Sequence, residues 1–278
     1  MKPKNTKNQE NPVQTLPMRV LVTGASRGIG RAICLRLASQ GAEIAACGSA
    51  HADELDAVIA EAAKQGGRVV PLLGNLADPA TPALLVEQAV ATFGGLDAVV
   101  SNAGVSRPST LAKLETEDWD YLMAVNTRAP WLLAKAAYPA LRKSRGSFVS
   151  VASMSGVQPY PGMGAYSPSK AAVLMLVRTL AQEWATDGIR VNAVSPGLIH
   201  TSLTAKVYAD VPTKVAREAL VPLHRIGDPD ADIAGLVAFL IGPDAAYVTG
   251  QNLLADGGLM DAVHGLIPGR PATERQAS

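Results

Sequence analysis

A tyrosine and a lysine four residues apart carry the strongest chemical signal in this chain. Tyr166 and Lys170 share one face of a helix predicted over residues 166–184, so a phenol and an ammonium group lie close together. A neighbouring cation favours the ionised phenol, which ordinarily titrates at about pH 10, and brings it closer to acting as an acid and base at physiological pH. Ser153 ends a predicted strand upstream, where its hydroxyl could contact the same substrate oxygen. Taken alone, a Tyr/Lys pair on a helix surface would be the simpler interpretation.

A glycine-rich loop, Thr23-Gly-Ala-Ser-Arg-Gly-Ile-Gly30, is the second signal. Gly24 allows a tight turn, Gly28 allows the backbone to approach a pyrophosphate, and Gly30 permits close packing of a helix on a strand. The N-terminus of the following helix then offers free N–H groups to phosphate. The spacing is GxxxGxG and not the commoner GxGxxG. The loop predicts a dinucleotide site, with a purely structural turn as the alternative.

These residues lie within a regular alternation of short apolar runs and longer helical patterns. Strands are predicted at residues 18–23, 43–48, 69–73, 96–101, 147–151, 190–193 and 252–255. Helices are predicted at residues 28–40, 53–65, 82–93, 117–143, 166–184 and 233–241. Near-continuous apolar strands joined through helices indicate an α/β fold with a doubly wound, mostly parallel, seven-stranded Rossmann-type sheet and helices on both faces. In such a sheet, ligands bind outside the carboxyl ends of the strands.

One domain is predicted, because no linker or internal repeat divides the chain and 278 residues suit a single large core. Residues 1–17 are predicted to form a polar N-terminal tail, residues 18–260 a single Rossmann-type domain, and residues 261–278 a C-terminal tail.

Composition argues against several classes of protein. The 25 Lys and Arg residues nearly balance the 24 Asp and Glu residues, so no net field favours nucleic acid or an anionic membrane. The apolar runs are too short to span a bilayer, and the N-terminus lacks the apolar segment of a secretory signal. Cys34 and Cys47 lack metal-ligand spacing and suit a reducing compartment, so a cytoplasmic protein is expected. The four histidines are scattered, and no metal site is predicted.

Several motifs occur together in one order: the glycine loop, Asn102-Ala103-Gly104, Asn126, Ser153, Tyr166-xxx-Lys170 and Pro196-Gly197. With them, residues 18–260 resemble the short-chain dehydrogenase/reductase family, and especially its 3-oxoacyl-(acyl-carrier-protein) reductase-like members. The resemblance implies an NAD(P)-dependent oxidoreductase that interconverts a carbonyl and a secondary alcohol by hydride transfer. It also implies a homo-oligomer, most simply a homotetramer formed through the long helices.

The resemblance assigns roles to the motif residues. Tyr166 is expected to be the general acid and base, and Lys170 to lower its pKa and hold the nicotinamide ribose. Ser153 is expected to bind the substrate oxygen, and Asn126 to complete a proton relay. The predicted cofactor-binding residues are Gly24, Ser26, Arg27, Gly28, Ile29, Gly30, Ser49, Asn75, Leu76, Asn102, Ala103, Gly104, Tyr166, Lys170, Pro196, Gly197, Ile199 and Thr201.

NADP(H) is expected to be favoured over NAD(H). An NAD site usually places an acid after the second strand, but residues 46–50 here read Ala-Cys-Gly-Ser-Ala and carry none. Arg27 and the Ser49 hydroxyl could both contact a 2′-phosphate. This set of contacts to a 2′-phosphate is incomplete, because many NADP-dependent relatives carry an arginine where this chain has Ser49.

The expected substrate is a small ketone or secondary alcohol, polyols and sugars included. The alternative within the same chemistry is 3-oxoacyl-(acyl-carrier-protein) reduction. Against it, Asp187 stands where such relatives often carry an arginine, and like charge opposes an acidic carrier. Lys143 and Arg145 could partly compensate. An alternative of a different class is a catalytically silent dinucleotide sensor, which the intact tyrosine and lysine oppose.

Pro130 predicts a break in the long helix over residues 117–143. In a regular α-helix the N–H of residue 130 would bond to the carbonyl of Asn126, and proline has no N–H. The carbonyl of Asn126 is therefore expected to be free. In the resembled family this carbonyl is thought to hold a water linked to the lysine; a simple kink is the alternative.

Overall fold

Seven strands form one parallel sheet in residues 17–49 and 52–266, the part of the chain that the computed structural model describes. The strands are β1 (Arg19–Thr23), β2 (Glu43–Gly48), β3 (Arg68–Leu73), β4 (Ala98–Ser101), β5 (Ser147–Val151), β6 (Arg190–Pro196) and β7 (Asn252–Ala255). Their spatial order is β3-β2-β1-β4-β5-β6-β7, so the chain winds outward in both directions from the β1/β4 pair. The doubly wound α/β fold predicted from the sequence is confirmed.

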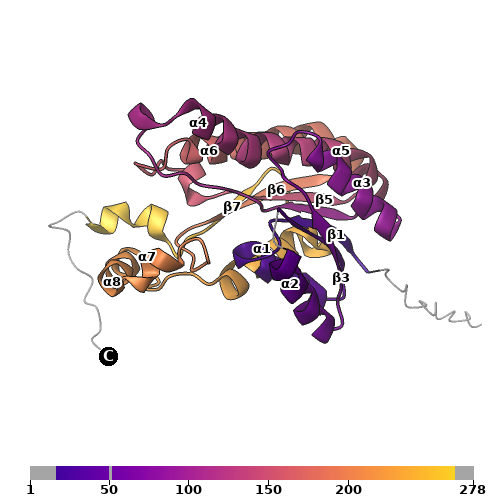
Figure 1. Cartoon of the computed structure of the whole chain (residues 1–278), viewed down its shortest axis with the longest axis horizontal. Helices are drawn as coiled ribbons and strands as arrows, with labels where there is room; N and C mark the ends of the chain where they lie inside the picture. Colours follow the sequence, from indigo (N-terminus) through magenta and orange to yellow (C-terminus); the bar gives the residue numbers. More distant parts are fainter. Residues whose placement is uncertain (1–16, 50–51, 267–278) are drawn as a thin grey trace, which may run out of the picture.

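Helices cover both faces of this sheet (Figure 1). They are α1 (Gly28–Ser39), α2 (Ala52–Lys64), α3 (Thr81–Phe93), α4 (Thr116–Met123), α5 (Ala129–Ser144), α6 (Tyr166–Trp184), α7 (Ala205–Ala209), α8 (Val211–Leu220) and α9 (Gly235–Ile241). One hydrophobic core joins α1, α2 and α9 to the sheet, and a second joins α3, α5 and α6 to its other face. Because both faces are covered, every residue of β4 and β5 is buried, whereas the edge strands β3 and β7 are partly exposed.

The helix predicted over residues 117–143 is interrupted at the position that the proline indicates. A π-helical turn (Ala124–Arg128) separates α4 from α5, and the N–H of Ala129 donates to the carbonyl of Ala124. Pro130 follows immediately, where it has no N–H to continue the ladder. The predicted interruption is therefore present, as an inserted π turn around Asn126.

The termini extend beyond the described residues. Of the predicted N-terminal tail, only Pro17 is described. Of the predicted C-terminal tail, residues 261–266 belong to a 3-10 segment (Leu259–Leu266), and the rest lies outside the described residues. The limits of the predicted domain stay a prediction. No helix in the described ranges is both long and apolar enough to cross a membrane.

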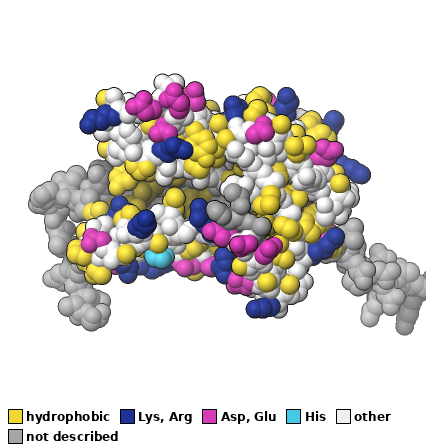
Figure 2. Space-filling model, viewed as in Figure 1, with side chains coloured by type: hydrophobic (Ala, Val, Ile, Leu, Met, Phe, Trp, Pro, Cys, Tyr) yellow, Lys and Arg dark blue, Asp and Glu magenta, His cyan; other side chains and the backbone are white. Residues whose placement is uncertain are grey.

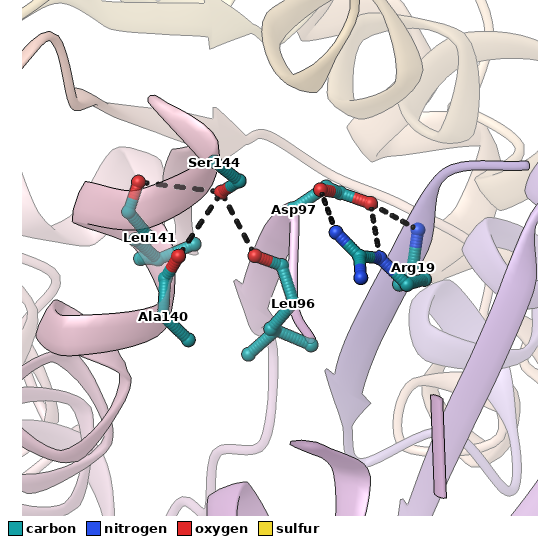
Figure 3. Close-up of polar contacts among 6 residues, drawn as sticks. All are labelled: Arg19, Leu96, Asp97, Ala140, Leu141 and Ser144. Carbon is teal, nitrogen blue, oxygen red and sulfur yellow. Dashed lines mark hydrogen bonds and ion pairs between the residues drawn. The ribbon is translucent and has the colours of Figure 1, made fainter. Parts of the chain in front are cut away.

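Two polar clusters stabilise the sheet at the end opposite the carboxyl ends of its strands. Arg19 opens β1 and donates to Asp97, just before β4, through its backbone N–H (2.9 Å), Nε (2.8 Å) and Nη2 (2.7 Å) (Figure 3). Burial would raise the pKa of Asp97, but hydrogen bonds and the charge of Arg19 hold it below its usual range. Nearby, the Ser144 hydroxyl donates to the carbonyl of Leu96 (2.9 Å) and ties the end of α5 to the same edge.

Arg190, at the start of β6, ties the sheet to the end of α9. Its guanidinium donates to four carbonyls: those of Leu240 (2.5 Å), Ile241 (3.1 Å), Gly242 (3.0 Å) and Ala245 (3.1 Å). Leu240 and Ile241 belong to the last turn of α9, whose carbonyls a helix leaves without partners, and the positive charge also suits that end of the helix dipole. Arg190 is therefore a structural residue at the edge of the sheet opposite the glycine loop.

Candidate active site

The glycine loop turns sharply out of β1 and forms a cradle at the start of α1. Gly24 (φ +64°) and Gly28 (φ +53°) adopt left-handed conformations that favour glycine. A Cβ on Gly24 would stand 2.9 Å from the Cα of Ala103, so the loop passes directly over the segment after β4. Gly30 packs against the carbonyl of Gly24, and Ile29 packs against the core below. The cap residue Arg27 makes no side-chain cap on α1, so the first backbone N–H groups of the helix face the cradle without one.

Thr23 and Asn102 brace this cradle from beneath. The Asn102 amide donates to the carbonyls of Thr23 (3.0 Å) and Gly24 (3.1 Å). In return, the Thr23 hydroxyl accepts from the backbone N–H groups of Asn102 (3.1 Å) and Ala103 (3.2 Å). The amide of Asn102 is thus used to shape the loop. Sequence reasoning did not assign Thr23 a role, although it opens the motif.

Tyr166 and Lys170 open α6, beside the end of β5. The Lys170 side chain is buried, and its Nζ donates to the carbonyl of Val151 (3.0 Å) and lies 5.9 Å from the centre of the Tyr166 ring. Ser153 follows β5, and its hydroxyl accepts from the N–H of Ser155 (3.1 Å). A Cβ on Gly156 would stand 2.8 Å from the Lys170 backbone, so a glycine there lets the serine turn pack against α6. The predicted trio is therefore brought together.

Burial dominates the titration of this pair. It lowers the pKa of Lys170 to about 8, because a charged ammonium group loses its hydration in the interior. Burial also raises the pKa of Tyr166, and a hydrogen bond with the Ser153 hydroxyl offsets part of that rise. The sequence led us to expect a phenol pKa lowered by the nearby cation. In the protein chain by itself the pKa moves the other way, because loss of solvent outweighs the hydrogen bond with Ser153.

Asn126 lies in the π turn and is fully buried, and all the hydrogen bonds of its side chain hold neighbouring segments in place. Its Oδ1 accepts from the N–H of Val105 (2.9 Å), and its Nδ2 donates to the carbonyl of Val105 (2.9 Å) and to the Ser169 hydroxyl (3.1 Å). The Ser169 hydroxyl donates to the carbonyl of Tyr166 (2.7 Å), and Thr127 donates to the carbonyl of Ser169 (3.0 Å). This network links the loop after β4 to the first turn of α6. Sequence reasoning missed Thr127 and Ser169, whose types alone gave no signal.

The segment after β6 closes the cradle from the other side. Gly197 packs against Asp256, where a Cβ would stand 2.6 Å from the Asp256 Cα. The N–H of Thr201 and the carbonyl of Ile199 both bond to the Thr204 hydroxyl (2.9 and 2.8 Å). A Cβ on Gly28 would stand 3.4 Å from Thr201 Cβ, so this segment touches the glycine loop. Pro196 is buried at the end of β6.

The segment from Leu198 to Gly227 is joined at its base. Ile199 and Gly227 form a parallel bridge, with the N–H of His200 donating to the carbonyl of Gly227 and the N–H of Gly227 to that of Leu198 (2.8 Å each). Between these positions lie α7 and α8, and we refer to residues 200–226 as the lid. In Figure 2, a hollow with many hydrophobic side chains lies between the lid and the α4–α6 layer.

The second strand ends in a more acidic setting than the sequence suggested. Ser49 is exposed after β2, Leu76 is buried, and the Asn75 side chain accepts from the N–H of Ala77 (3.0 Å). Here the Ser26 hydroxyl donates to Glu54 (3.0 Å), from the first turn of α2, and Arg27 lies 3.7 Å from the same carboxylate. Residues 46–50 themselves carry no acid, as stated from the sequence. The helix that follows β2 supplies one.

The two cysteines are packing residues. Cys34 and Cys47 are buried, and burial raises the pKa of each thiol to about 12, so neither is a nucleophile at neutral pH. In the described ranges, no three His, Cys, Asp or Glu side chains are grouped to hold a metal ion.

The cradle suits a dinucleotide. Its glycines leave space that side chains would fill: a Cβ on Gly104 would stand 3.3 Å from Lys170 Nζ and 3.5 Å from Asn126 Oδ1. Free N–H groups at the start of α1 suit phosphate, and Gly104 packs closely against the Lys170 side chain. The glycine loop, Gly104 and Lys170 therefore lie at the same end of the sheet as Tyr166.

Comparison with known proteins agrees with this arrangement. Residues 24–260 match the family described as enoyl-(acyl carrier protein) reductase. The 3-oxoacyl-[acyl-carrier-protein] reductase FabG of Thermotoga maritima is 38% identical over 243 residues, covering 86% of this chain and 96% of that protein. A structure described as a short-chain alcohol dehydrogenase from Sinorhizobium meliloti 1021 is similar, with a TM-score of 0.84, 34% identity, and coverage of 90% of this chain and 99% of that one.

A second solved structure was determined with a nucleotide. It is described as a 2-deoxy-D-gluconate 3-dehydrogenase from Agrobacterium tumefaciens with bound NADP, and it has a TM-score of 0.81 and 34% identity, covering 89% of this chain and 98% of that one. Fold, motif order and these likenesses agree over nearly the whole described chain. The chain belongs to the short-chain dehydrogenase/reductase family, whose members are NAD(P)-dependent oxidoreductases that interconvert carbonyl and alcohol groups.

Proposed function

We propose that this enzyme uses NADP(H) to interconvert a small, neutral ketone and its secondary alcohol, polyols and sugars included. The observation that carries the proposal is the grouping of Ser153, Tyr166 and buried Lys170 at the end of the dinucleotide cradle. When bound, the nicotinamide supplies or accepts the hydride, and the protein must handle the proton and the charge on oxygen.

Tyr166 and Ser153 are the groups that meet the reacting oxygen. Their hydroxyls are neighbours, so both can donate hydrogen bonds to one carbonyl oxygen. Burial raises the pKa of the phenol and keeps it protonated at neutral pH, which suits a proton donor to a developing alkoxide. Lys170 places a positive charge behind the phenol and helps it carry negative charge after the proton leaves.

The remaining predicted residues position the nucleotide. The glycine loop (residues 24–30) and the start of α1 hold the pyrophosphate, and Gly104 leaves room for the ribose beside Lys170. Ile199 and Thr201 would hold the nicotinamide amide. Asn126 acts through its side-chain network to Val105 and Ser169. Its backbone carbonyl is the part that we assign to a relay, because Pro130 has no N–H to donate to it.

A small cavity of about 230 Å³ beside the turn that follows Ser153 has no charged lining residue, which favours a neutral substrate. Its lining residues are Met154, Ser155, Gln158, Pro159, Tyr160, Leu259 and Met260. None carries a charge, so an acidic substrate gains no ion pair there, whereas a small ketone or hydroxylated substrate can use apolar contacts and a few hydrogen bonds.

Reduction of a 3-oxoacyl-(acyl-carrier-protein) is the second candidate, favoured by the likeness to the Thermotoga reductase. Asp187 disfavours binding of an acidic carrier protein both through its own charge and through the residue that it pairs with. Its carboxylate lies 2.9 Å from Nε of Arg142 and accepts from the Tyr138 hydroxyl (2.6 Å). Asp187 therefore also neutralises a cation that an acidic carrier would need, leaving Lys143 and Arg145 as nearby basic residues.

Steady-state kinetics test the proposal. Wild type is assayed with NADPH and NADH across small ketones, sugars and acetoacetyl-acyl-carrier-protein, beside Tyr166→Phe. We expect the highest kcat/KM with a small ketone and NADPH, and a loss of about a thousandfold in Tyr166→Phe. A clear preference for the acyl-carrier-protein substrate supports the second candidate. Tight nucleotide binding without turnover of any substrate would identify a dinucleotide sensor.

We also propose a cytoplasmic homotetramer. Large apolar side chains are exposed on the helices of one face of the sheet, among them Trp119 of α4 (39%), Trp131 of α5 (45%) and Met175 of α6 (57%). Burial of this area between copies would remove it from water. Light scattering after gel filtration measures the mass; a monomer at micromolar concentration would contradict the proposal.

A further inference from the structure

Glu54 places a carboxylate among the residues expected to receive the adenosine end of the cofactor. Its Oε2 accepts from the Ser26 hydroxyl (3.0 Å), and its Oε1 lies 3.7 Å from Nη1 of Arg27. Ser26 also borders the end of β2, because a Cβ on Gly48 would stand 4.0 Å from Ser26 Cβ. The glycine loop, the end of β2 and the first turn of α2 therefore converge on one carboxylate.

The chemistry of this position depends on the 2′ substituent of the adenosine ribose. In doubly wound dinucleotide sites, a carboxylate after the second strand accepts a hydrogen bond from a 2′-hydroxyl, whereas an arginine accommodates a 2′-phosphate. This chain brings both groups to one place and pairs them with each other. Arg27 is 61% exposed along its side chain and Glu54 is 40% exposed, so either can reorient without disturbing the core.

We propose that Glu54 is a specificity-determining residue, which competes with the 2′-phosphate of NADP(H) for Ser26 and Arg27. A 2′-hydroxyl can donate to this carboxylate. A 2′-phosphate is repelled by it and gains Arg27 only when the guanidinium leaves Glu54. Glu54 thus reduces the difference in affinity by which the enzyme favours NADP(H) over NAD(H). This inference rests on the proposed function in one respect: the dinucleotide must bind with its adenosine ribose beside the glycine loop.

Removal of the charge should change the binding of the two nucleotides unequally. In Glu54→Gln, the amide still fits beside Ser26 but no longer neutralises Arg27 or repels phosphate. We expect NADPH to bind about tenfold more tightly, a modest factor because the pair is solvent-exposed. NADH should bind equally well or more weakly, since the amide is a poorer acceptor for the 2′-hydroxyl. The difference should shrink as salt is added.

Asp53 provides a matched control. It belongs to the same first turn of α2, is exposed, and carries the same charge. Asp53→Asn changes the net charge of the protein by the same amount without touching the Glu54 carboxylate. The dissociation constants of NADPH and NADH are measured by calorimetry for wild type, Glu54→Gln, Asp53→Asn and Arg27→Gln, without any turnover. Circular dichroism verifies that each variant folds.

The decisive quantity is the NADPH/NADH affinity ratio of each variant, compared with that of wild type. A shift of about tenfold toward NADPH in Glu54→Gln, absent in Asp53→Asn, supports the inference, as does an opposite shift in Arg27→Gln. An equal change for both nucleotides, no change, or the same shift in Asp53→Asn overturns it. A wild type that itself prefers NADH contradicts the proposed cofactor preference but leaves this ratio test valid. A wild type that binds neither nucleotide overturns both.

Discussion

Lys170 gives the sharpest quantitative prediction, because it is a buried cation whose Nζ forms its hydrogen bond with a neutral carbonyl. Within the described residues, no carboxylate lies within ion-pair distance of it. Burial lowers its pKa from 10.5 to about 8 in the folded protein. Each pKa unit corresponds to about 1.4 kcal/mol, so at pH 7 the folded state bears a penalty of about 3 kcal/mol for keeping this lysine charged.

The sign of the pH dependence follows from proton counting. Between pH 8 and 10.5 the unfolded chain keeps the lysine proton and the folded chain releases it, so the free energy of unfolding rises with pH. At pH 9.5 the penalty has fallen to about 1 kcal/mol. We therefore expect the free energy of unfolding of wild type, relative to that of Lys170→Met, to increase by about 2 kcal/mol from pH 7 to pH 9.5.

Urea unfolding followed by tryptophan fluorescence measures this difference at each pH. Because the two proteins share every other titrating group, their difference isolates the lysine. Lys206→Met, an exposed substitution on the lid, corrects for the loss of one positive charge. A difference that stays constant within about 0.5 kcal/mol over this range would refute the reasoning, because it would show that Lys170 titrates alike in both states.

Three further predictions address the helix break, the carrier surface and the edge of the sheet. Pro130→Ala restores an N–H and should close the π turn, lowering kcat several-fold with little change in nucleotide affinity; full kcat with a retained π turn in a crystal structure would make Pro130 a simple kink. Asp187→Arg should free Arg142 and raise kcat/KM for acetoacetyl-acyl-carrier-protein at least fivefold while that for small ketones stays constant; equal changes for both substrates would contradict the docking argument. Arg190→Met should lower the free energy of unfolding by about 2 kcal/mol in urea titration, because helix carbonyls lose their partners; a loss below about 0.5 kcal/mol would show that solvent replaces them.

The strands and the motif positions could be predicted because local patterns decide them. β2, β5, β7 and α6 begin and end at the predicted residues, since Gly, Pro and a change of hydrophobic period mark their limits. The trio of Ser153, Tyr166 and Lys170 follows from topology, because α6 is the next α-helix after β5 and the carboxyl ends of parallel strands share one edge.

Other parts of the site depend on contacts that no local pattern reveals. Glu54 reaches the glycine loop only because α2 packs beside α1. The side chain of Asn126 could face a substrate or a neighbouring loop, and only the fold shows that Val105 uses it. The direction of the Tyr166 pKa shift also escaped prediction, since burial of the phenol depends on everything packed around it.

The bridge between Ile199 and Gly227 has a consequence for how this enzyme can change over time. The bridge holds the two ends of the lid together. The free-energy cost of closing such a loop depends only weakly on its length and rises by about 0.6 kcal/mol for each doubling of the number of residues. Insertions, deletions or an exchanged sequence within α7 and α8 should therefore leave the sheet, the acid/base residues and Thr201 in place. The substrate range of the enzyme can therefore change through replacement of α7 and α8, while the catalytic residues on the sheet stay the same.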